Sequence, residues 1–187
     1  MMKSDSVVRK MRPQKIVILL LAVAAWFGIM VHPAYGAAEP SGCSASAESR
    51  KLDYWLGDWT VANPGSAAGA TSKISLSLDQ CLFIEQWENG KGHAGENVFA
   101  YSADDKTWRA LFADNEGRAH IFTDGTITSG SAEFRGPSRG PNGESILHRV
   151  RIVRVNADKV EQIWDKSTDN GATWKTVFRG EYSRKTQ

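Results

Sequence analysis

SKISLSLDQCLFIEQWE, residues 72–88, predicts a β-hairpin. Its first half alternates apolar and polar residues at Ile74, Leu76 and Leu78, which is the period of a strand with one buried face. Its second half is rich in aromatic and branched residues and follows after a tight turn. The stretch therefore predicts two short antiparallel strands joined directly to each other.

Segments of the same kind occupy the rest of the chain, and each ends in Gly, Asn, Asp or Ser. With the hairpin they make about ten strands, and Gly125 is expected to separate the sixth from the seventh. Only one helical turn is expected, near Glu48–Trp55 before the first strand. The other segments are 58–62, 96–102, 107–114, 118–124, 126–135, 145–155, 159–167 and 173–185.

Consecutive antiparallel strands of this number predict an all-β fold, an up-and-down barrel whose closure removes exposed edges. A sandwich of two open sheets is the alternative. A barrel of about this size is just wide enough to hold one small ligand.

LDYWLGDW, residues 52–59, is expected to close one end of this barrel. Gly57 allows a turn into the first strand, the indole of Trp59 caps the core, and Tyr54 and Trp55 lie on the helical turn behind it. Closed barrels of the calycin type begin in this way, although a single G-x-W is also compatible with ordinary core aromatics.

Residues 1–36 have the pattern of a secretory signal peptide: a basic start, an apolar run over 16–31, and small residues around Ala34 and Gly36. We expect cleavage after Gly36 or Ala38; an uncleaved membrane anchor is the alternative. Residues 37–50 are interpreted as a flexible tether and 51–187 as the barrel domain. The mature protein is expected in the periplasm or outside the cell, without membrane insertion.

Charge and cysteine content fit this location. Five of the 23 basic and one of the 21 acidic residues lie in the leader, so the remainder has 18 and 20 and a net charge of −2. Nothing indicates a nucleic-acid partner, and the oligomeric state is not indicated. Cys43 and Cys81 are expected to form a disulfide, which in the chain-entropy model stabilises by roughly 3–4 kcal/mol for a loop of about 39 residues. Two free thiols, or lipidation of Cys43, are the alternatives.

Two features that suggest chemistry have simpler explanations. STDNGATW, residues 167–174, matches the Asp-box of sialidase propellers, but it occurs once in a chain too short for a propeller. We interpret it as a hairpin turn bent at 169–171 and covered by Trp174. His93, His120 and His148 lie on separate segments without metal-ligand spacing, so no metal or other cofactor is predicted.

The predicted ligand site lies on the inner faces of three strands. Alternation puts Glu85 on one face with Phe83 and Trp87, which would make it a buried acid if that face is inward. We expect such an acid to be protonated, ligand-bound or paired with Arg149 or Arg151. A few polar groups among aromatic rings are typical of a small-molecule pocket, although a filled core is the alternative. The predicted ligand-binding residues are Glu85, Trp87, Asn97, Gln162 and Trp164.

LDYWLGDW, the I-E-Q-W strand, YSADDKTWRALFADNEG and VEQIWDKSTDNGATW…GEYSRK together resemble an exported bacterial family of unknown function that opens with F-D-F-W-x-G-x-W. The resemblance covers residues 51–185 and implies a lipocalin-like fold without a known activity. Ala110 and Phe112 stand where that family often has glutamine and tryptophan, which would change a shared pocket. The matching positions are Trp55, Gly57, Trp59, Glu85, Trp87, Trp108, Asp114, Gln162, Trp164 and Trp174.

The favoured function is an exported barrel that binds a small apolar or aromatic ligand. An isomerase, cyclase or hydrolase that uses Glu85 as general acid or base is the first alternative, because burial would raise the pKa of that carboxyl. A structural envelope protein without ligand is the second.

Overall fold

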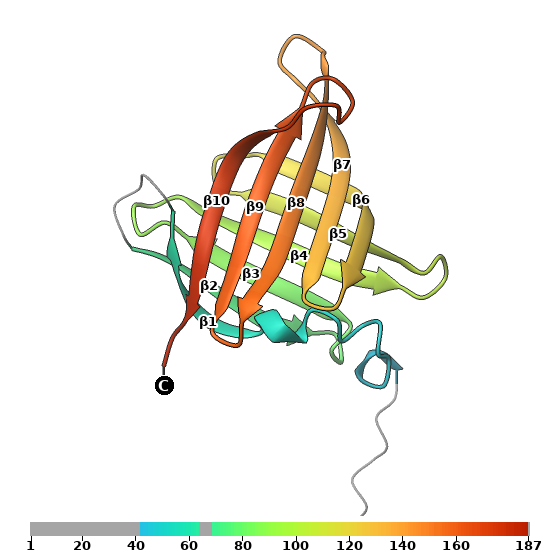
Figure 1. Ribbon diagram of the computed structural model, residues 1–187, viewed down its shortest axis with the longest axis vertical. Coiled ribbons are helices and arrows are strands. Elements are labelled where there is room, and N and C mark those ends of the chain that lie inside the picture. The colour runs from blue at the N-terminus through green and yellow to red at the C-terminus, as the bar shows by residue number, and fades with distance from the viewer. Residues whose placement is uncertain (1–41, 64–68, 187) are drawn as a thin grey trace, which may run out of the picture. The chain divides into compact units, whose positions relative to one another are not determined.

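The computed structural model describes residues 42–63 and 69–186, and these form an all-β domain (Figure 1). The predicted signal peptide lies outside the described residues. Ten strands follow two short 3-10 turns, η1 (Gly42–Ser44) and η2 (Asp53–Trp55). The strands are β1 (Gly57–Ala62), β2 (Ala70–Ser77), β3 (Leu82–Glu88), β4 (Ala94–Ser102), β5 (Thr107–Asp114), β6 (Ala119–Thr128), β7 (Ser131–Arg139), β8 (Ser145–Asn156), β9 (Lys159–Ser167) and β10 (Lys175–Arg184).

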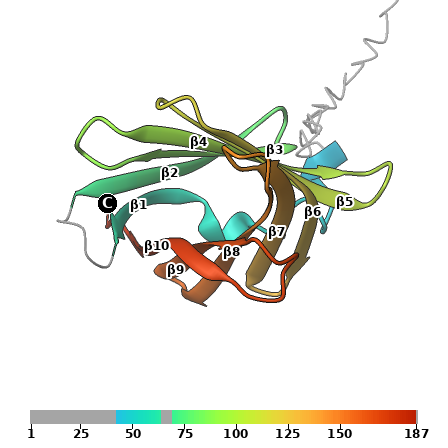
Figure 2. The ribbon, with the colours of Figure 1, turned by 90° about the horizontal axis from the view of Figure 1, so that it is seen from above.

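The strands close into one up-and-down barrel. Each pairs antiparallel with its neighbours in the chain, and β1 pairs with β10, with Trp59 opposite Arg184, to complete the ring (Figure 2). This confirms the predicted ten-stranded barrel of lipocalin-like form. No helix in the described part of the chain has the length and apolar character needed to cross a membrane.

Two local predictions were wrong. Gly125 does not separate two strands, because β6 runs through it to Thr128 and the turn follows at 129–130. Gly125 lies opposite Trp108 where the register of β5 and β6 shifts, and a side chain there would meet the Trp108 carbonyl oxygen at 2.5 Å. Close backbone approach therefore explains this glycine. Leu78 does not continue the alternation of β2: it lies in the turn with φ of 49° and is 70% exposed.

The inward faces of the strands form the core. Phe83, Phe99, Phe122 and Phe134 are almost completely buried, each on the same face of its strand as the other core residues. Every strand supplies alternate residues to the interior. The part of the barrel nearest η2 is therefore filled by aromatic side chains.

Trp55 and Trp59 close the lower end of the barrel, as predicted for LDYWLGDW. Both are completely buried, and the Trp59 indole donates a hydrogen bond to the Trp55 carbonyl oxygen at 2.9 Å. Arg184 covers the Trp59 ring at 4.2 Å from its centroid and donates hydrogen bonds to the carbonyl oxygens of Leu56 and Tyr54. The last strand is thereby fastened to the segment that precedes the first.

A disulfide holds the N-terminal segment against the same end. Cys43 and Cys81 are bonded across 38 positions, which confirms the predicted pair. The described part of the predicted tether, residues 42–50, is also bound by Arg50, which donates a hydrogen bond at 2.6 Å to the carbonyl oxygen of Gln80 in the β2–β3 turn. These residues are therefore attached to the barrel at two points, Cys43 and Arg50.

Candidate functional site

A cavity of about 270 Å³ occupies the barrel at the end opposite the plug, our name for residues 52–59, which close the other end. The lining residues nearest the open end lie next to the β3–β4, β5–β6 and β9–β10 connections. The β2–β3 and β8–β9 turns lie at the closed end, where Arg50 and Arg184 bind them. The cavity is thus a pocket with one closed end. Its lining residues are Glu85, Trp87, His93, Asn97, Phe112, Arg118, His120, Val150, Gln162, Trp164, Lys166, Val177 and Phe178.

All five residues predicted from alternation line this cavity: Glu85, Trp87, Asn97, Gln162 and Trp164. Glu85 and Asn97 are direct partners in the β3–β4 register. Gln162 and Trp164 come from β9, and the hydrogen bond of Gln162 with Glu85 spans 77 positions of sequence. The barrel brings the two groups together across its interior, where sequence alone gives no register.

Glu85 is the most buried polar group of the cavity, with no exposed surface. Its Oε1 accepts hydrogen bonds from Ser72 Oγ at 2.9 Å and from Tyr182 Oη at 2.7 Å. Its Oε2 accepts from Asn97 Nδ2 at 2.8 Å and from Gln162 Nε2 at 3.1 Å. Each oxygen therefore receives two donors, which accounts for all four acceptor positions of a carboxylate.

Burial raises the pKa of Glu85 above its ordinary value, and the four hydrogen bonds act in the opposite direction. The pKa of Tyr182 is raised well above its ordinary value by burial and by the neighbouring carboxylate. The Tyr182 hydroxyl also lies 2.8 Å from Gln162 Oε1. A proton on Glu85 can therefore be accommodated if Tyr182 donates to Gln162 instead.

Of the three states expected for Glu85, the pairing with Arg149 or Arg151 was wrong. Both arginines donate to Asp165, at 2.9 Å and 3.0 Å, while Val150 between them lines the cavity. Alternation along β8 therefore puts the two guanidinium groups on the outer face of the barrel. The carboxyl of Glu85 is satisfied by neutral donors alone.

His148 is fixed in one tautomer beside the cavity. The Trp164 indole donates to its Nδ1 at 2.9 Å, so a neutral ring carries its proton on Nε2 and donates it to Ser138 Oγ at 2.7 Å. Burial, with His120 and Lys166, lowers the pKa of His148 to about 4. His148 thus has no free nitrogen with which to activate Ser138, and the pair is not a nucleophile with its base.

His120 completes an aromatic wall that the separate sequence positions did not predict. Its ring centroid lies 4.3 Å from that of His148 and 5.1 Å from that of Trp164, and it stacks on Phe112. Burial lowers the pKa of His120, and Lys166 lowers it further. A neutral imidazole is therefore expected here, contributing to a mostly apolar surface.

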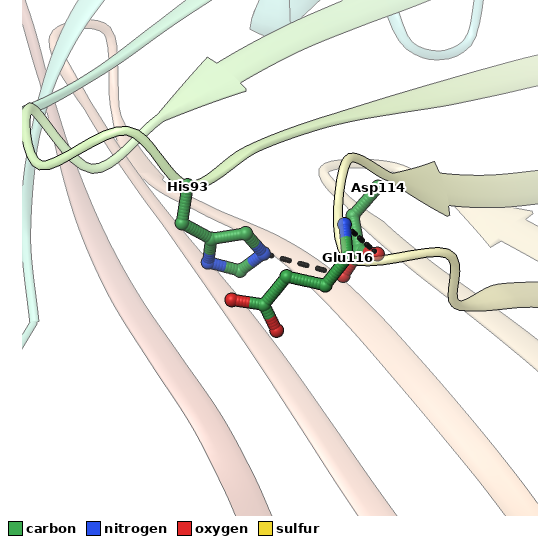
Figure 3. A group of neighbouring side chains, drawn as sticks. All are labelled: His93, Asp114 and Glu116. Carbon is green, nitrogen blue, oxygen red and sulfur yellow. Dashed lines mark hydrogen bonds and ion pairs between the residues drawn. The ribbon is translucent and has the colours of Figure 1, made fainter.

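His93, Asp114 and Glu116 place potential metal ligands within 4.8 Å of one another at the outer rim (Figure 3). The guanidinium of Arg118 already lies in this group, at 2.7 Å from Asp114 Oδ2, 2.8 Å from Glu116 and 3.0 Å from His93 Nε2. Burial raises the pKa of Asp114, but hydrogen bonds from the backbone and side chain of Arg118 and the contact with His93 outweigh it and lower the pKa to about 2. The group is thus an ion-pair cluster whose cation is Arg118.

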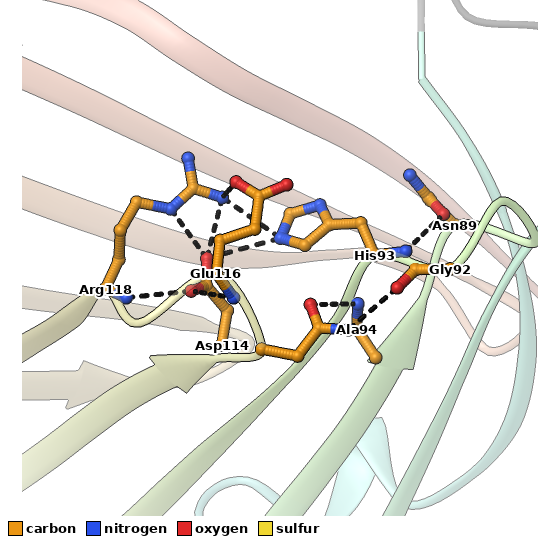
Figure 4. A network of polar contacts seen from close by, with 8 residues as sticks. Asn89, Gly92, His93, Ala94, Asp114, Glu116 and Arg118 are labelled. Carbon is orange, nitrogen blue, oxygen red and sulfur yellow. Dashed lines mark hydrogen bonds and ion pairs between the residues drawn. The ribbon is translucent and has the colours of Figure 1, made fainter.

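Hydrogen bonds beside this cluster hold the β3–β4 and β5–β6 connections at the rim of the cavity. Asn89 Oδ1 accepts a hydrogen bond from the backbone of His93, and Asn115 Nδ2 donates to the Gly92 carbonyl oxygen at 2.7 Å (Figure 4). The Asn115 bond and the contact between His93 and Asp114 tie the β3–β4 connection to the β5–β6 connection, whereas the Asn89 bond lies within the β3–β4 connection. One side of the cavity mouth is therefore held in place by side-chain hydrogen bonds.

The Asp-box segment is a hairpin turn outside the cavity, as predicted. Asp169 accepts a hydrogen bond from Thr173 Oγ1 at 2.6 Å, and Gly171 has φ of 89°. The Trp174 ring lies over this glycine and under the guanidinium of Arg149, 4.1 Å from the ring centroid. The motif therefore has a structural role in the β9–β10 connection.

Sequence reasoning missed several lining residues, such as Lys166 and Phe178, and also Ser72 and Tyr182, which donate hydrogen bonds to Glu85. Both lie on the inward faces of their strands, with Ser72 sharing a face with Ile74 and Tyr182 with Gly180. Alternation was a usable signal for both positions. The chain matches no protein-family model and no curated protein.

Proposed function

We propose that the chain is an exported binding protein that holds a small, mainly aromatic molecule in the barrel cavity. The cavity of about 270 Å³ carries this proposal. An apolar cavity of about 150 Å³ already accommodates benzene, so a ligand with two fused rings is a suitable size. The disulfide supports a location outside the cytoplasm, either in the periplasm or beyond the cell.

Aromatic rings provide the walls that such a ligand would contact. Trp87 and Phe178 meet edge to face with centroids 6.0 Å apart, and Phe112 and Trp164 do so at 5.0 Å. Rings of this kind give a large contact area with little loss of side-chain entropy. Asn97 adds a polar contact, since within the described residues its Oδ1 has no hydrogen-bond partner.

Binding is favoured over catalysis by the hydrogen bonds of Glu85. A general base needs an acceptor position directed at the substrate, and all four positions of this carboxylate are taken by protein donors. The raised pKa of Glu85 suits a general acid or base, but its carboxyl has no exposed surface through which it could exchange a proton with a substrate. In our proposal Glu85 orients Asn97 and Gln162, whose remaining amide atoms face a ligand. An open cavity also fits a binding protein better than a purely structural one.

The test fills the cavity from within. Val150 lines the cavity, and Val153 lies on the opposite face of the same strand, so Val150→Phe and Val153→Phe are a matched pair. Titration with 2-naphthoate and its neutral amide, followed by quenching of tryptophan fluorescence, should show saturable binding to the wild-type protein. Val150→Phe should weaken it about tenfold or more and Val153→Phe should not. Failure of both probes to bind the folded wild-type protein would contradict the proposal.

A further inference from the structure

We propose that the cavity selects an aromatic carboxylate, bound with its rings against the wall formed by Phe112 and Trp164 and its carboxylate at Lys166; this rests on the proposed function. Three charged residues line the cavity: Glu85, Arg118 and Lys166. Glu85 lies deep, and the other two lie near the mouth. The difference between the two cations decides where an anionic ligand would bind.

Arg118 is already neutralised. Its guanidinium forms ion pairs with Asp114 and with Glu116, at 2.7 Å and 2.8 Å. An anion approaching it would have to displace these carboxylates or accept their repulsion. Arg118 is therefore a poor anchor for a ligand.

Lys166 differs because, within the described residues, it makes no ion pair or side-chain hydrogen bond. It is only partly exposed, and its charge reaches into the aromatic wall, where it lowers the pKa of His120 and of His148. Lys175 stands directly opposite it in the β9–β10 register. Like charges placed directly opposite each other on paired strands repel, so an anion at this point would relieve an unfavourable contact.

The depth of the cavity sets the orientation of the ligand. Gln162, Trp164 and Lys166 follow one another on the inward face of β9, and Gln162 is bonded to Glu85. At about 3.3 Å per residue, Lys166 lies roughly 13 Å along the strand from Gln162. A carboxylate at the mouth would thus be attracted by Lys166 and kept away from the buried acid, while the rings lie beside Trp164.

The experiment compares 2-naphthoate with 2-naphthamide, which have the same rings and differ in charge. Isothermal titration should show that wild-type protein binds the carboxylate about tenfold more tightly than the amide. Lys166→Met should remove this difference by weakening only the carboxylate, and Lys166→Arg should keep most of it. Lys159→Met, an exposed lysine at the other end of the same strand, is the control for general surface charge.

The outcomes separate the two proposals. If neither probe binds, the proposed function fails and this inference fails with it. If both probes bind equally well, or if Lys166→Met and Lys159→Met weaken the carboxylate equally, the cavity still binds aromatic molecules but Lys166 does not select an anion. Because the two probes are also compared on wild-type protein, the preference for an anion is tested even if a variant does not fold.

Discussion

Replacing Tyr182 with Phe tests whether the buried polar cluster holds the barrel together. The substitution removes one hydroxyl and keeps the ring, which is 1% exposed. The hydroxyl lies 2.7 Å from Glu85 Oε1 and 2.8 Å from Gln162 Oε1. Its single hydrogen reaches one of these acceptors at a time and goes to the carboxylate when Glu85 is ionised, so its loss leaves Glu85 Oε1 one donor short in a place that solvent does not reach.

A hydrogen bond to a charged partner contributes roughly 1.5–3 kcal/mol and a neutral one about 1 kcal/mol. We therefore expect Tyr182→Phe to lower the free energy of unfolding by about 2–3 kcal/mol. Tyr54→Phe is the matched control, because its hydroxyl donates to the Ile152 carbonyl oxygen at 3.0 Å in a partly buried position. That variant should lose about 1 kcal/mol.

The difference should also depend on pH. The hydrogen bond from Tyr182 lowers the pKa of Glu85 against the effect of burial, so its loss raises that pKa further. An unfolded glutamate titrates near about 4.3 in both proteins, and below that value Glu85 is protonated in every state. The stability difference should therefore be smallest in acid and grow as pH rises through the pKa of folded wild-type Glu85.

Urea unfolding of the disulfide-intact proteins, followed by circular dichroism at several pH values, measures both quantities. The polar cluster would lose its role if Tyr182→Phe were no more destabilising than Tyr54→Phe across the whole range.

Three further predictions concern the closed end and the cavity wall. Replacing Cys43 and Cys81 with serine should lower the free energy of unfolding by roughly 3–4 kcal/mol, measured in urea; equal stability with and without the bond would count against this. Arg184→Met should lower it by about 2–3 kcal/mol, since it loses three carbonyl partners (Leu56, Tyr54 and Ala157) and an indole face, whereas the exposed Arg154→Met should stay within about 0.5 kcal/mol. His148 should titrate near pH 4 by NMR. An unfolded histidine titrates near about 6.5, so the contribution of His148 to stability should fall as pH drops from there towards pH 4. A ring charged at pH 6 would refute the assignment of His148 as a buried neutral imidazole.

Strand alternation explains most of what the sequence predicted. It put Glu85 and Trp87 on one face and Gln162 and Trp164 on another, and both faces point inward. The same rule, applied to β8, would have directed Arg149 outward once Val150 was taken as inward. The wrong partner for Glu85 came from seeking an opposite charge, whereas neutral donors satisfy it.

Barrel closure explains what the sequence did not predict. His120 and His148 come from strands that are not adjacent, so their contact at 4.3 Å depends on strand tilt and register across the interior. Gly125 had the appearance of a turn residue, but the approach of Trp108 from the neighbouring strand requires it. Periodicity along one strand carries no information about such distances.

Native mass spectrometry of the protein purified from its own host tests the central claim most directly. A cavity built to hold a small aromatic molecule predicts a population whose mass exceeds that of the chain by one small ligand. That excess should disappear in Val150→Phe and persist in Val153→Phe. A wild-type protein that carries no such mass, and gains none when incubated with 2-naphthoate or its amide, would contradict the claim that this barrel binds a ligand.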